Sequence, residues 1–269
     1  MKIAARHYCF IGLAVVVVIA MLIDYRPELE VSDESRRMFE YLDSLPEGSL
    51  LLISFDHEAS AMPEIRPLAL ALLRHAFARR HRLIGIALMA EGTGIGYGLM
   101  NQMAKEYNCE YGSDYVYLGF KPQYIAAILS MGESLPQTFP DDYTGRAWAD
   151  LSMLAGVRNY GDLAGVISIA DGSMVMHWVE YGKGRYGVPV SAFVAAAMVT
   201  TFDPYLASGQ LTAMVGGLRG AAEYEQLIGR PGAGARAMLA QTSMHIYVVA
   251  LIVIGNVVYF VGRRKGRGR

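Results

Sequence analysis

The stretch SLLLISF at residues 49–55 decides the fold class of this chain. It is a short, nearly continuous apolar run, which is the pattern of a strand buried on both faces. The turn sequence SLPEG at residues 44–48 precedes it, and a helical stretch at residues 63–80 follows it. The run therefore predicts one strand of a sheet that helices cover on both sides.

The same alternation of apolar run and helical stretch recurs along the chain. Strands are predicted at residues 49–55, 83–89, 114–120, 163–170 and 188–194, and helices at 33–44, 63–80, 94–107, 122–131, 173–182 and 209–228. Residues 133–162 break the rhythm with prolines and glycines and hold one short predicted helix at 147–155. Strands separated by helices predict an α/β domain with a mostly parallel, five-stranded sheet in a three-layer, Rossmann-like arrangement.

Composition and charge narrow the class of protein. The chain has 269 residues, 53% of them hydrophobic, and a mean hydropathy of +0.26. These values favour a globular domain with a small number of membrane segments over a soluble protein or a multi-spanning transporter. Residues 24–243 carry all 25 acidic residues and 17 basic ones, a formal charge of −8. This acidic balance excludes nucleic acid as an expected partner.

The sequence HIYVVALIVIGNVVYFVG at residues 245–262 is the stronger membrane segment. It holds no Asp, Glu, Lys or Arg, and as a helix its 18 residues rise about 27 Å, close to the thickness of the hydrocarbon layer. Tyr247 and Tyr259 lie near its ends, as interfacial aromatic residues do. The alternative is a buried core helix followed by a basic tail, but core helices rarely run so long without polar residues.

The apolar run at residues 10–23 is shorter and marginal for a span, even with Tyr8 and Cys9 added. A cleaved signal peptide is the alternative. We expect an uncleaved signal anchor, because the sequence MLIDYRPELE that ends and follows the run offers no small-residue cleavage site. Cys9 lies at the edge of the first apolar run and Cys109 in the globular part, so no disulfide between them is expected. No metal-ligand spacing is present in the sequence.

Both membrane segments have basic outer flanks, Lys2 and Arg6 before the first and RRKGRGR at residues 263–269 after the second. The positive-inside tendency predicts both termini in the cytoplasm and the domain outside it, which in a bacterium is the periplasm or cell exterior. The expected organisation is a signal anchor at 1–23, an extracytoplasmic domain at 24–232, a linker and transmembrane helix at 233–262, and a cytoplasmic tail at 263–269.

Polar residues follow four of the predicted strands, at the edge of the sheet where ligands of open parallel sheets bind. The candidate ligand-binding residues are Asp56, His57, Glu58, Glu91, Thr93, Asp171, Ser173, Thr201 and Asp203. They predict an acidic, hydroxyl-rich crevice that suits a cation, a sugar or another polar molecule. The alternative for the Asp, Ser and Thr residues at strand-to-helix junctions is a helix cap, because these are the ordinary N-cap residues. The alternative for the run Asp56, His57 and Glu58 is a solvated loop.

The glycine cluster GTGIGYG at residues 92–98 misses the spacing of a dinucleotide fingerprint, and no phosphate-binding-loop lysine is present. We therefore expect no nicotinamide, flavin or nucleoside triphosphate cofactor. The cluster indicates either an anion site at a helix N-terminus or close packing of a helix on the sheet. No nucleophile-elbow motif occurs, so no catalytic residue is assigned.

Small and polar residues near the end of the chain predict contacts with other subunits. Gly216, Gly217 and Gly220 lie on one face of the predicted 209–228 helix, and Asn256 lies in the middle of the second membrane segment. Each has an intramolecular alternative. Two functions follow: a scaffold or assembly subunit of a membrane complex, working as a homo-oligomer or with other subunits, or a membrane-tethered hydrolase or polar-ligand-binding domain that uses the acidic strand ends.

Overall fold

The computed structural model describes residues 5–23 and 28–266. These residues fall into two compact units. The α/β domain is the unit Glu28–Gly234, and the other unit holds residues 5–23 and 235–266. All of the strands belong to the first unit.

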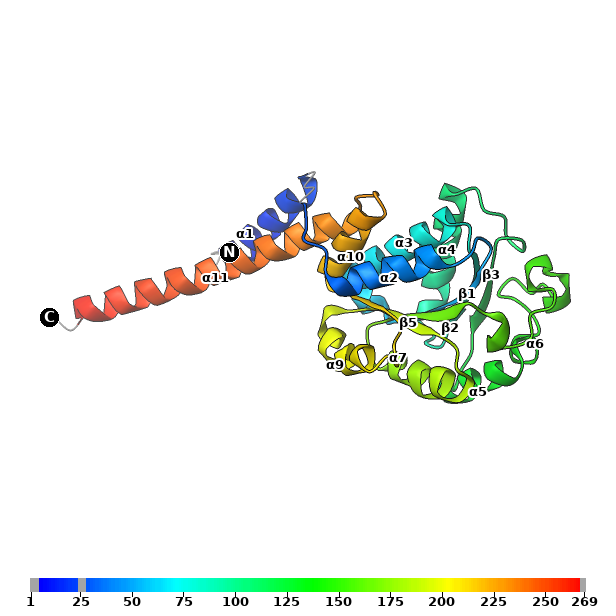
Figure 1. Ribbon diagram of the computed structural model, residues 1–269. Helices are drawn as coiled ribbons and strands as arrows, with labels where there is room; N and C mark the ends of the chain where they lie inside the picture. The colour runs from blue at the N-terminus through cyan, green and yellow to red at the C-terminus, as the bar shows by residue number, and fades with distance from the viewer. Residues whose placement is uncertain (1–4, 24–27, 267–269) are drawn as a thin grey trace. The chain divides into compact units, whose positions relative to one another are not determined.

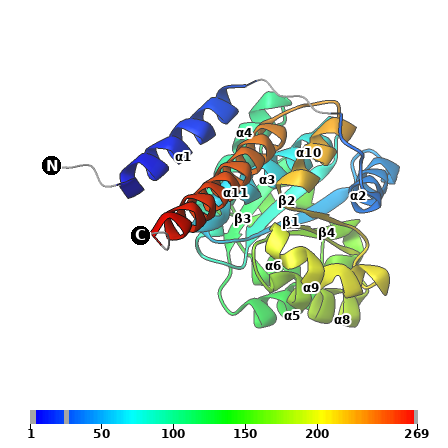
Figure 2. The same ribbon diagram turned by 90° about the vertical axis from the view of Figure 1, so that its left-hand side faces the viewer.

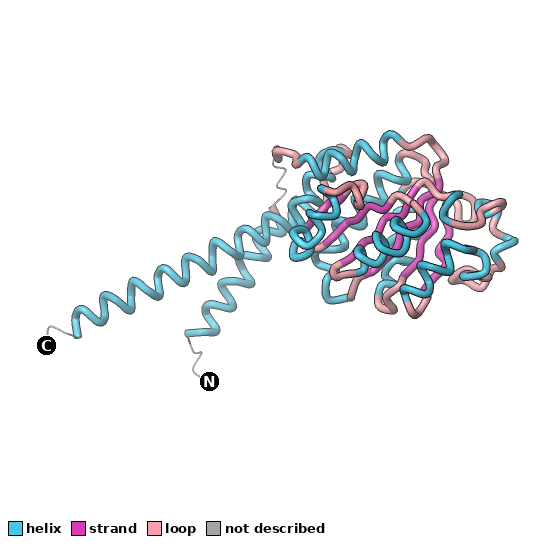
Figure 3. The backbone as a smooth tube through the Cα atoms, turned by 60° about the horizontal axis from the view of Figure 1, so that its bottom comes forward, coloured by secondary structure: helices cyan, strands magenta, loops and turns pink. Residues whose placement is uncertain are grey.

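The domain is built on a six-stranded, entirely parallel sheet (Figures 1 and 3). The strands are β1 (Leu50–Asp56), β2 (Arg82–Ala87), β3 (Tyr115–Phe120), β4 (Gly165–Ala170), β5 (Val190–Val194) and β6 (Met214–Gly216). Their order across the sheet is β3-β2-β1-β4-β5-β6. The predicted α/β class and parallel sheet are confirmed, with six strands in place of five.

The additional strand β6 lies in the segment predicted as the first part of a helix at 209–228, so that prediction is wrong there. The helix α10 covers only Gly217–Leu227. Met214, Val215 and Gly216 pair with β5 instead, and the side chains of Met214 and Val215 are only 1% and 0% exposed. Gly217 has φ +68°, a left-handed conformation that separates the strand from the helix.

Helices cover both faces of the sheet (Figures 1 and 2). The first face carries α2 (Asp33–Ser44), α3 (Met62–Ala78), α4 (Gly92–Glu106) and α10. The second carries α5 (Tyr124–Glu133), α7 (Met174–His177), the π-helix η5 (Trp178–Lys183), α8 (Gly184–Tyr186) and α9 (Ala196–Ala207). Two-sided cover explains why the strands read as continuous apolar runs.

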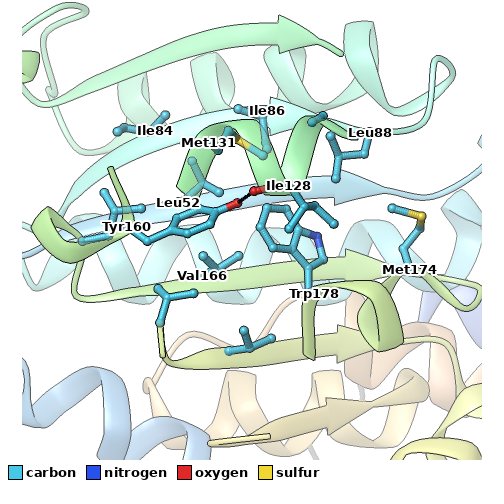
Figure 4. Packing of buried hydrophobic residues seen from close by; sticks show 14 of the residues in the cluster. Leu52, Ile84, Ile86, Leu88, Ile128, Met131, Tyr160, Val166, Met174 and Trp178 are labelled. Atoms are coloured by element: carbon cyan, nitrogen blue, oxygen red, sulfur yellow. Dashed lines mark hydrogen bonds between the residues drawn. The ribbon is translucent and has the colours of Figure 1, made fainter. Parts of the chain in front are cut away.

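Successive residues of β1 supply the two halves of the core. Leu51 and Ile53 pack with α3 and α10, whereas Leu52 packs with α5 and η5. Figure 4 shows the second half, in which the fully buried Trp178 lies with Leu52 and Ile128. The Tyr160 hydroxyl donates a 2.8 Å hydrogen bond to the Ile128 carbonyl in this layer. Trp178 is thus fixed in the core of the second layer.

Residues 133–162 form an irregular segment beside β3. It contains α6 (Leu135–Thr138) and the 3-10 turns η2 (Trp148–Asp150), η3 (Ser152–Leu154) and η4 (Tyr160–Asp162). The predicted helix at 147–155 is therefore replaced by two short 3-10 turns, which Leu151 separates with extended backbone. The Tyr143 amide donates to the Tyr117 carbonyl at 2.9 Å. The middle of the segment thus lies beside the edge strand β3, whereas Tyr160 near its end packs with Trp178 on the second face of the sheet.

Helix α9 was not predicted, because its sequence AAMVTTFDPYLA shows little apolar periodicity and contains Pro204. Only Phe202 and Leu206 of this helix are buried. Their contact with the second half of the core holds α9 against the sheet. Tertiary packing therefore outweighs the weak local preference of this segment.

One helix of the described residues is long and apolar enough to cross a membrane, Ala233–Val261 within α11 (Ala233–Gly266). The apolar helix near the N-terminus, Arg6–Leu22 within α1 (Ala5–Leu22), is shorter than a span. Helix α11 also begins inside the predicted linker. The carboxylate of Glu225 accepts hydrogen bonds from the amides of Gly232 and Gly234, which satisfies donors at this helix start.

The chain enters and leaves the α/β domain at one place. Leu29 exchanges two hydrogen bonds with the Gln226 side chain, at 2.8 and 3.0 Å. The Glu223 carboxylate is 1% exposed and accepts from the Ser32 amide, the Ser32 hydroxyl and the Ser35 hydroxyl. These contacts join the segment that follows α1 to the helix that precedes α11.

Candidate functional site

The sheet has a switch point between β1 and β4. From β1 the chain proceeds outward to β2 and β3, and then returns to β4 on the other side of β1. The connections on the two sides leave β1 and β4 in opposite directions, which opens a crevice at their carboxyl ends. Asp56 is paired in register with Ala170, so the residues that follow them meet. The Glu58 amide donates to the Asp171 carboxylate at 3.1 Å.

A cavity of about 380 Å³ lies at this point. Its volume is in the range of small-molecule sites. The lining residues come from the ends of β1, β2 and β4 and from the helices that follow β3 and β4: Glu58, Met89, Tyr124, Asp171, Gly172, Ser173, Met174 and His177. Glu58, Asp171 and Ser173 were predicted from the sequence as ligand-binding candidates, and the structure brings these three together.

The other candidates lie outside the cavity lining. The Glu91 carboxylate accepts the Ala59 amide at 2.7 Å and so closes the loop after β1. Thr93 lies in the first turn of α4. Thr201 and Asp203 are exposed on α9. His57 is fully buried, and its Nδ1 lies 3.3 Å from the Glu58 carbonyl.

Asp56, two residues before the lining residue Glu58, is a buried polar centre. Its side chain is fully buried, and its carboxylate accepts hydrogen bonds from four donors. The Ser54 hydroxyl at 2.7 Å and the Leu88 amide at 3.3 Å donate to Oδ1. The Ser168 hydroxyl at 2.8 Å and Trp178 Nε1 at 2.9 Å donate to Oδ2. Burial raises the pKa of the Asp56 carboxyl, and the four hydrogen bonds oppose that rise.

The helix after β4 changes its winding at the cavity. It is α-helical at α7 and becomes a π-helix from Trp178 to Lys183. π-Helices are rare and frequently occur at functional sites. The change follows His177, whose ring lies 4.6 Å from the Tyr124 ring and 6.3 Å from the Tyr181 ring. The tilted rings of Tyr124 and His177 therefore form an aromatic wall on one side of the cavity.

Sequence reasoning missed the wall and the thioethers of this cavity. His177 reads as an amphipathic boundary residue, and Tyr124 opens the α5 helix in a sequence without a motif. Met89 ends a predicted strand and Met174 lies in a predicted helix, and neither belongs to a motif. The usable signal is positional: in a parallel sheet the first turn of each following helix lies at the carboxyl edge, as Tyr124 does after β3.

Close packing accounts for the glycine cluster at 92–98. A Cβ atom at Gly92 would collide with the Phe55 carbonyl oxygen, and one at Gly96 would collide with the Phe55 ring. Gly98 faces open space. The glycines at 92 and 96 thus allow α4 to approach β1, which is the packing alternative left open by the sequence.

The candidate interface residues also have partners within the chain. A Cβ atom would meet Val199 at Gly216, Ala196 at Gly217 and Val215 at Gly220. Asn256 Nδ2 donates to the Ile252 carbonyl of its own helix at 2.9 Å. Comparisons of the chain with models of protein families, with curated proteins and with solved structures find no match.

Proposed function

We propose that this protein is a membrane-tethered binding domain for a small polar ligand, which it holds in the crevice between the carboxyl ends of β1 and β4. The observation that carries the proposal is the cavity of about 380 Å³ at the switch point of the sheet. Open α/β sheets bind their ligands at such points. The cavity also combines apolar walls with a small number of polar groups, the usual composition of a ligand site.

Polar groups in this cavity are available for a ligand. Glu58 is exposed, and its carboxylate accepts a long hydrogen bond of 3.4 Å from the Ser60 hydroxyl. Ser173 is exposed, and although it stands at the N-cap position of α7, its side chain forms no capping hydrogen bond. The capping role, which was the alternative for this serine, therefore does not explain it. A hydroxyl and two carboxylates converge on one space.

The apolar helix α11 and the hydrogen bonds that join the entry and the exit of the domain support a membrane tether. We propose that α1 and α11 both anchor the chain, with their basic flanks in the cytoplasm and the domain on the outer side. The hydrogen bonds of Leu29 with Gln226 and of Ser32 with Glu223 support a double anchor. Ends that lie close together on the domain allow both anchors to reach the same membrane surface.

A scaffold function has less support from the geometry. The glycines that suggested a subunit interface meet Val199, Ala196 and Val215 of the same domain. These contacts give the glycines a role in folding. Ligand binding instead has a formed cavity at the expected place, and it is the function that the geometry supports best.

Filling the cavity tests the proposal. Gly172 lines the cavity, has no positive φ, and has open space where a Cβ would lie. Gly172→Leu should therefore fold and occupy the ligand's space. Gly98→Leu is the matched control, because Gly98 is exposed on α4 and also faces open space.

The full chain in detergent micelles is screened by thermal unfolding against small polar compounds of positive, negative and zero charge. A ligand raises the Tm of the wild type and of Gly98→Leu, since binding to the folded state stabilises it. Gly172→Leu should show no such rise. The proposal is wrong if no compound raises the Tm, or if Gly172→Leu responds like the wild type.

A further inference from the structure

We infer that the ligand of this cavity is an organic cation, a small alkylammonium compound. The inference rests on the proposed function and specifies its ligand class. The charged residues that line the cavity are Glu58 and Asp171, and both are acidic. No lysine or arginine within residues 5–23 and 28–266 lines it. A cation is the charge that two converging carboxylates favour.

The buried carboxylate of Asp56, which adjoins the lining residues in the chain, also favours a positively charged ligand. Asp56 has an obligate donor on each oxygen, the Leu88 amide on Oδ1 and the Trp178 indole on Oδ2. No lysine or arginine of the described residues forms an ion pair with it. A buried charge is costly without an opposite charge nearby. A cation in the adjoining cavity would favour the ionised form of the Asp56 carboxyl.

Asp56 adjoins the cavity through the chain. Leu88 precedes the lining residue Met89, and Trp178 follows the lining residue His177. Asp56 is also paired in register with Ala170, which precedes the lining residue Asp171. Each of the lining residues Met89, His177 and Asp171 is thus the sequence neighbour of a residue that bonds to Asp56 or pairs with it. The Asp56 carboxyl group is therefore a near neighbour of the cavity lining.

The uncharged part of the lining suits an organic cation better than a metal ion. The ring centroids of Tyr124 and His177 lie 4.6 Å apart with the ring planes tilted by 38°, and Met89 and Met174 add polarisable thioethers. Aromatic faces attract alkylammonium groups. No group of three or more His, Cys, Asp or Glu side chains that could hold a metal ion occurs within residues 5–23 and 28–266. The site therefore offers carboxylates and aromatic surface without a metal-coordination shell.

Two compounds of similar size and shape, one charged and one neutral, test whether binding depends on the charge of the ligand. Choline is titrated into the full chain in detergent micelles, and dimethylbutanol, its uncharged carbon isostere, is titrated in parallel. Putrescine tests an ammonium without methyl groups, and calcium chloride tests a metal ion. Choline or putrescine should raise the Tm, whereas dimethylbutanol and calcium should leave it unchanged.

Variants then locate the bound cation. Asp171→Asn and Glu58→Gln should each weaken binding about tenfold or more, because each removes one charge-assisted contact. Asp203→Asn is the matched control, since Asp203 is an exposed carboxylate on α9 outside the lining, and it should bind as the wild type does. Tyr124→Phe keeps the aromatic face and should keep binding, whereas Tyr124→Ala should weaken it.

The outcomes separate this inference from the proposed function. If a neutral or anionic compound binds in a manner abolished by Gly172→Leu and no ammonium compound binds, the ligand class is wrong and the binding function stands. Calcium binding that depends on Asp171 would replace the organic cation with a metal ion. If no compound of any charge binds, the inference and the proposed function both fail.

Discussion

Trp178 Nε1 donates a hydrogen bond to Asp56 Oδ2 across 2.9 Å. The bond joins the first residue of a π-helix to the last residue of the central strand β1. Because His177 directly precedes Trp178 and Glu58 follows Asp56 by two residues, the bond fixes two walls of the cavity relative to each other. A buried polar contact thus sets the position of groups that a ligand would touch.

Removing the Asp56 carboxylate should destabilise the domain. Asp56→Asn places an amide NH2 group where Leu88 N–H and Trp178 Nε1–H each require an acceptor, so one donor loses its partner. We expect a loss of about 1–3 kcal/mol in the free energy of unfolding. Urea denaturation measures it, with Asp203→Asn as the exposed control. Equal stability of the two variants would show that the Asp56 contacts contribute little.

Two glycines of α4 should respond to alanine in opposite directions. Gly96→Ala places a methyl group against the Phe55 ring and should cost about 1–3 kcal/mol. Gly98→Ala faces open space and should stabilise the helix by up to about 1 kcal/mol. Chemical denaturation of both variants tests the close packing of α4 on β1. A stabilising Gly96→Ala would contradict that packing.

Stability should fall as the pH is lowered from about 6.5 to about 4. Burial lowers the pKa of His75 from 6.5 to about 4, so the unfolded chain binds a proton in this window that the folded chain does not. The loss amounts to about 3 kcal/mol across the window. The pKa of His81 is lowered in the same direction, chiefly by burial.

His75→Gln should therefore reduce the pH dependence without abolishing it. Glutamine keeps an acceptor for the Tyr224 hydroxyl, which lies 2.7 Å from His75 Nδ1. Unfolding free energies of the wild type and the variant are compared at several pH values between 4 and 6.5. An identical slope for the two proteins would rule out His75 as the titrating group.

Cysteine labelling tests the proposed topology. In a chain whose Cys9 and Cys109 are replaced by serine, Asp203→Cys places a thiol on the exposed surface of α9. Arg263→Cys places one after the apolar segment of α11. A membrane-impermeant maleimide should label the first in intact cells and the second only after permeabilisation. The reverse pattern would place the domain in the cytoplasm.

The sequence by itself determined the fold class and the strongest apolar segment. Runs such as residues 49–55 are continuous and apolar because both faces of the sheet are covered, and that signal is local. The local apolar pattern did not predict β6, because a strand of three residues is too short to show one. It did not predict α9 either, because this helix has weak apolar periodicity and only two buried residues. Both elements depend on contacts with distant parts of the chain.

Only the tertiary structure decided which polar residues share a site. Strand ends predicted nine candidates at one edge, yet the strand order places β1 beside β4 and so unites Glu58 with Asp171 and Ser173. Thr201 and Asp203 follow β5, one strand farther from the switch point, and lie on an exposed helix. Strand order results from the packing of the whole domain, because loop sequences fix neither the partner of a strand nor the side on which it pairs.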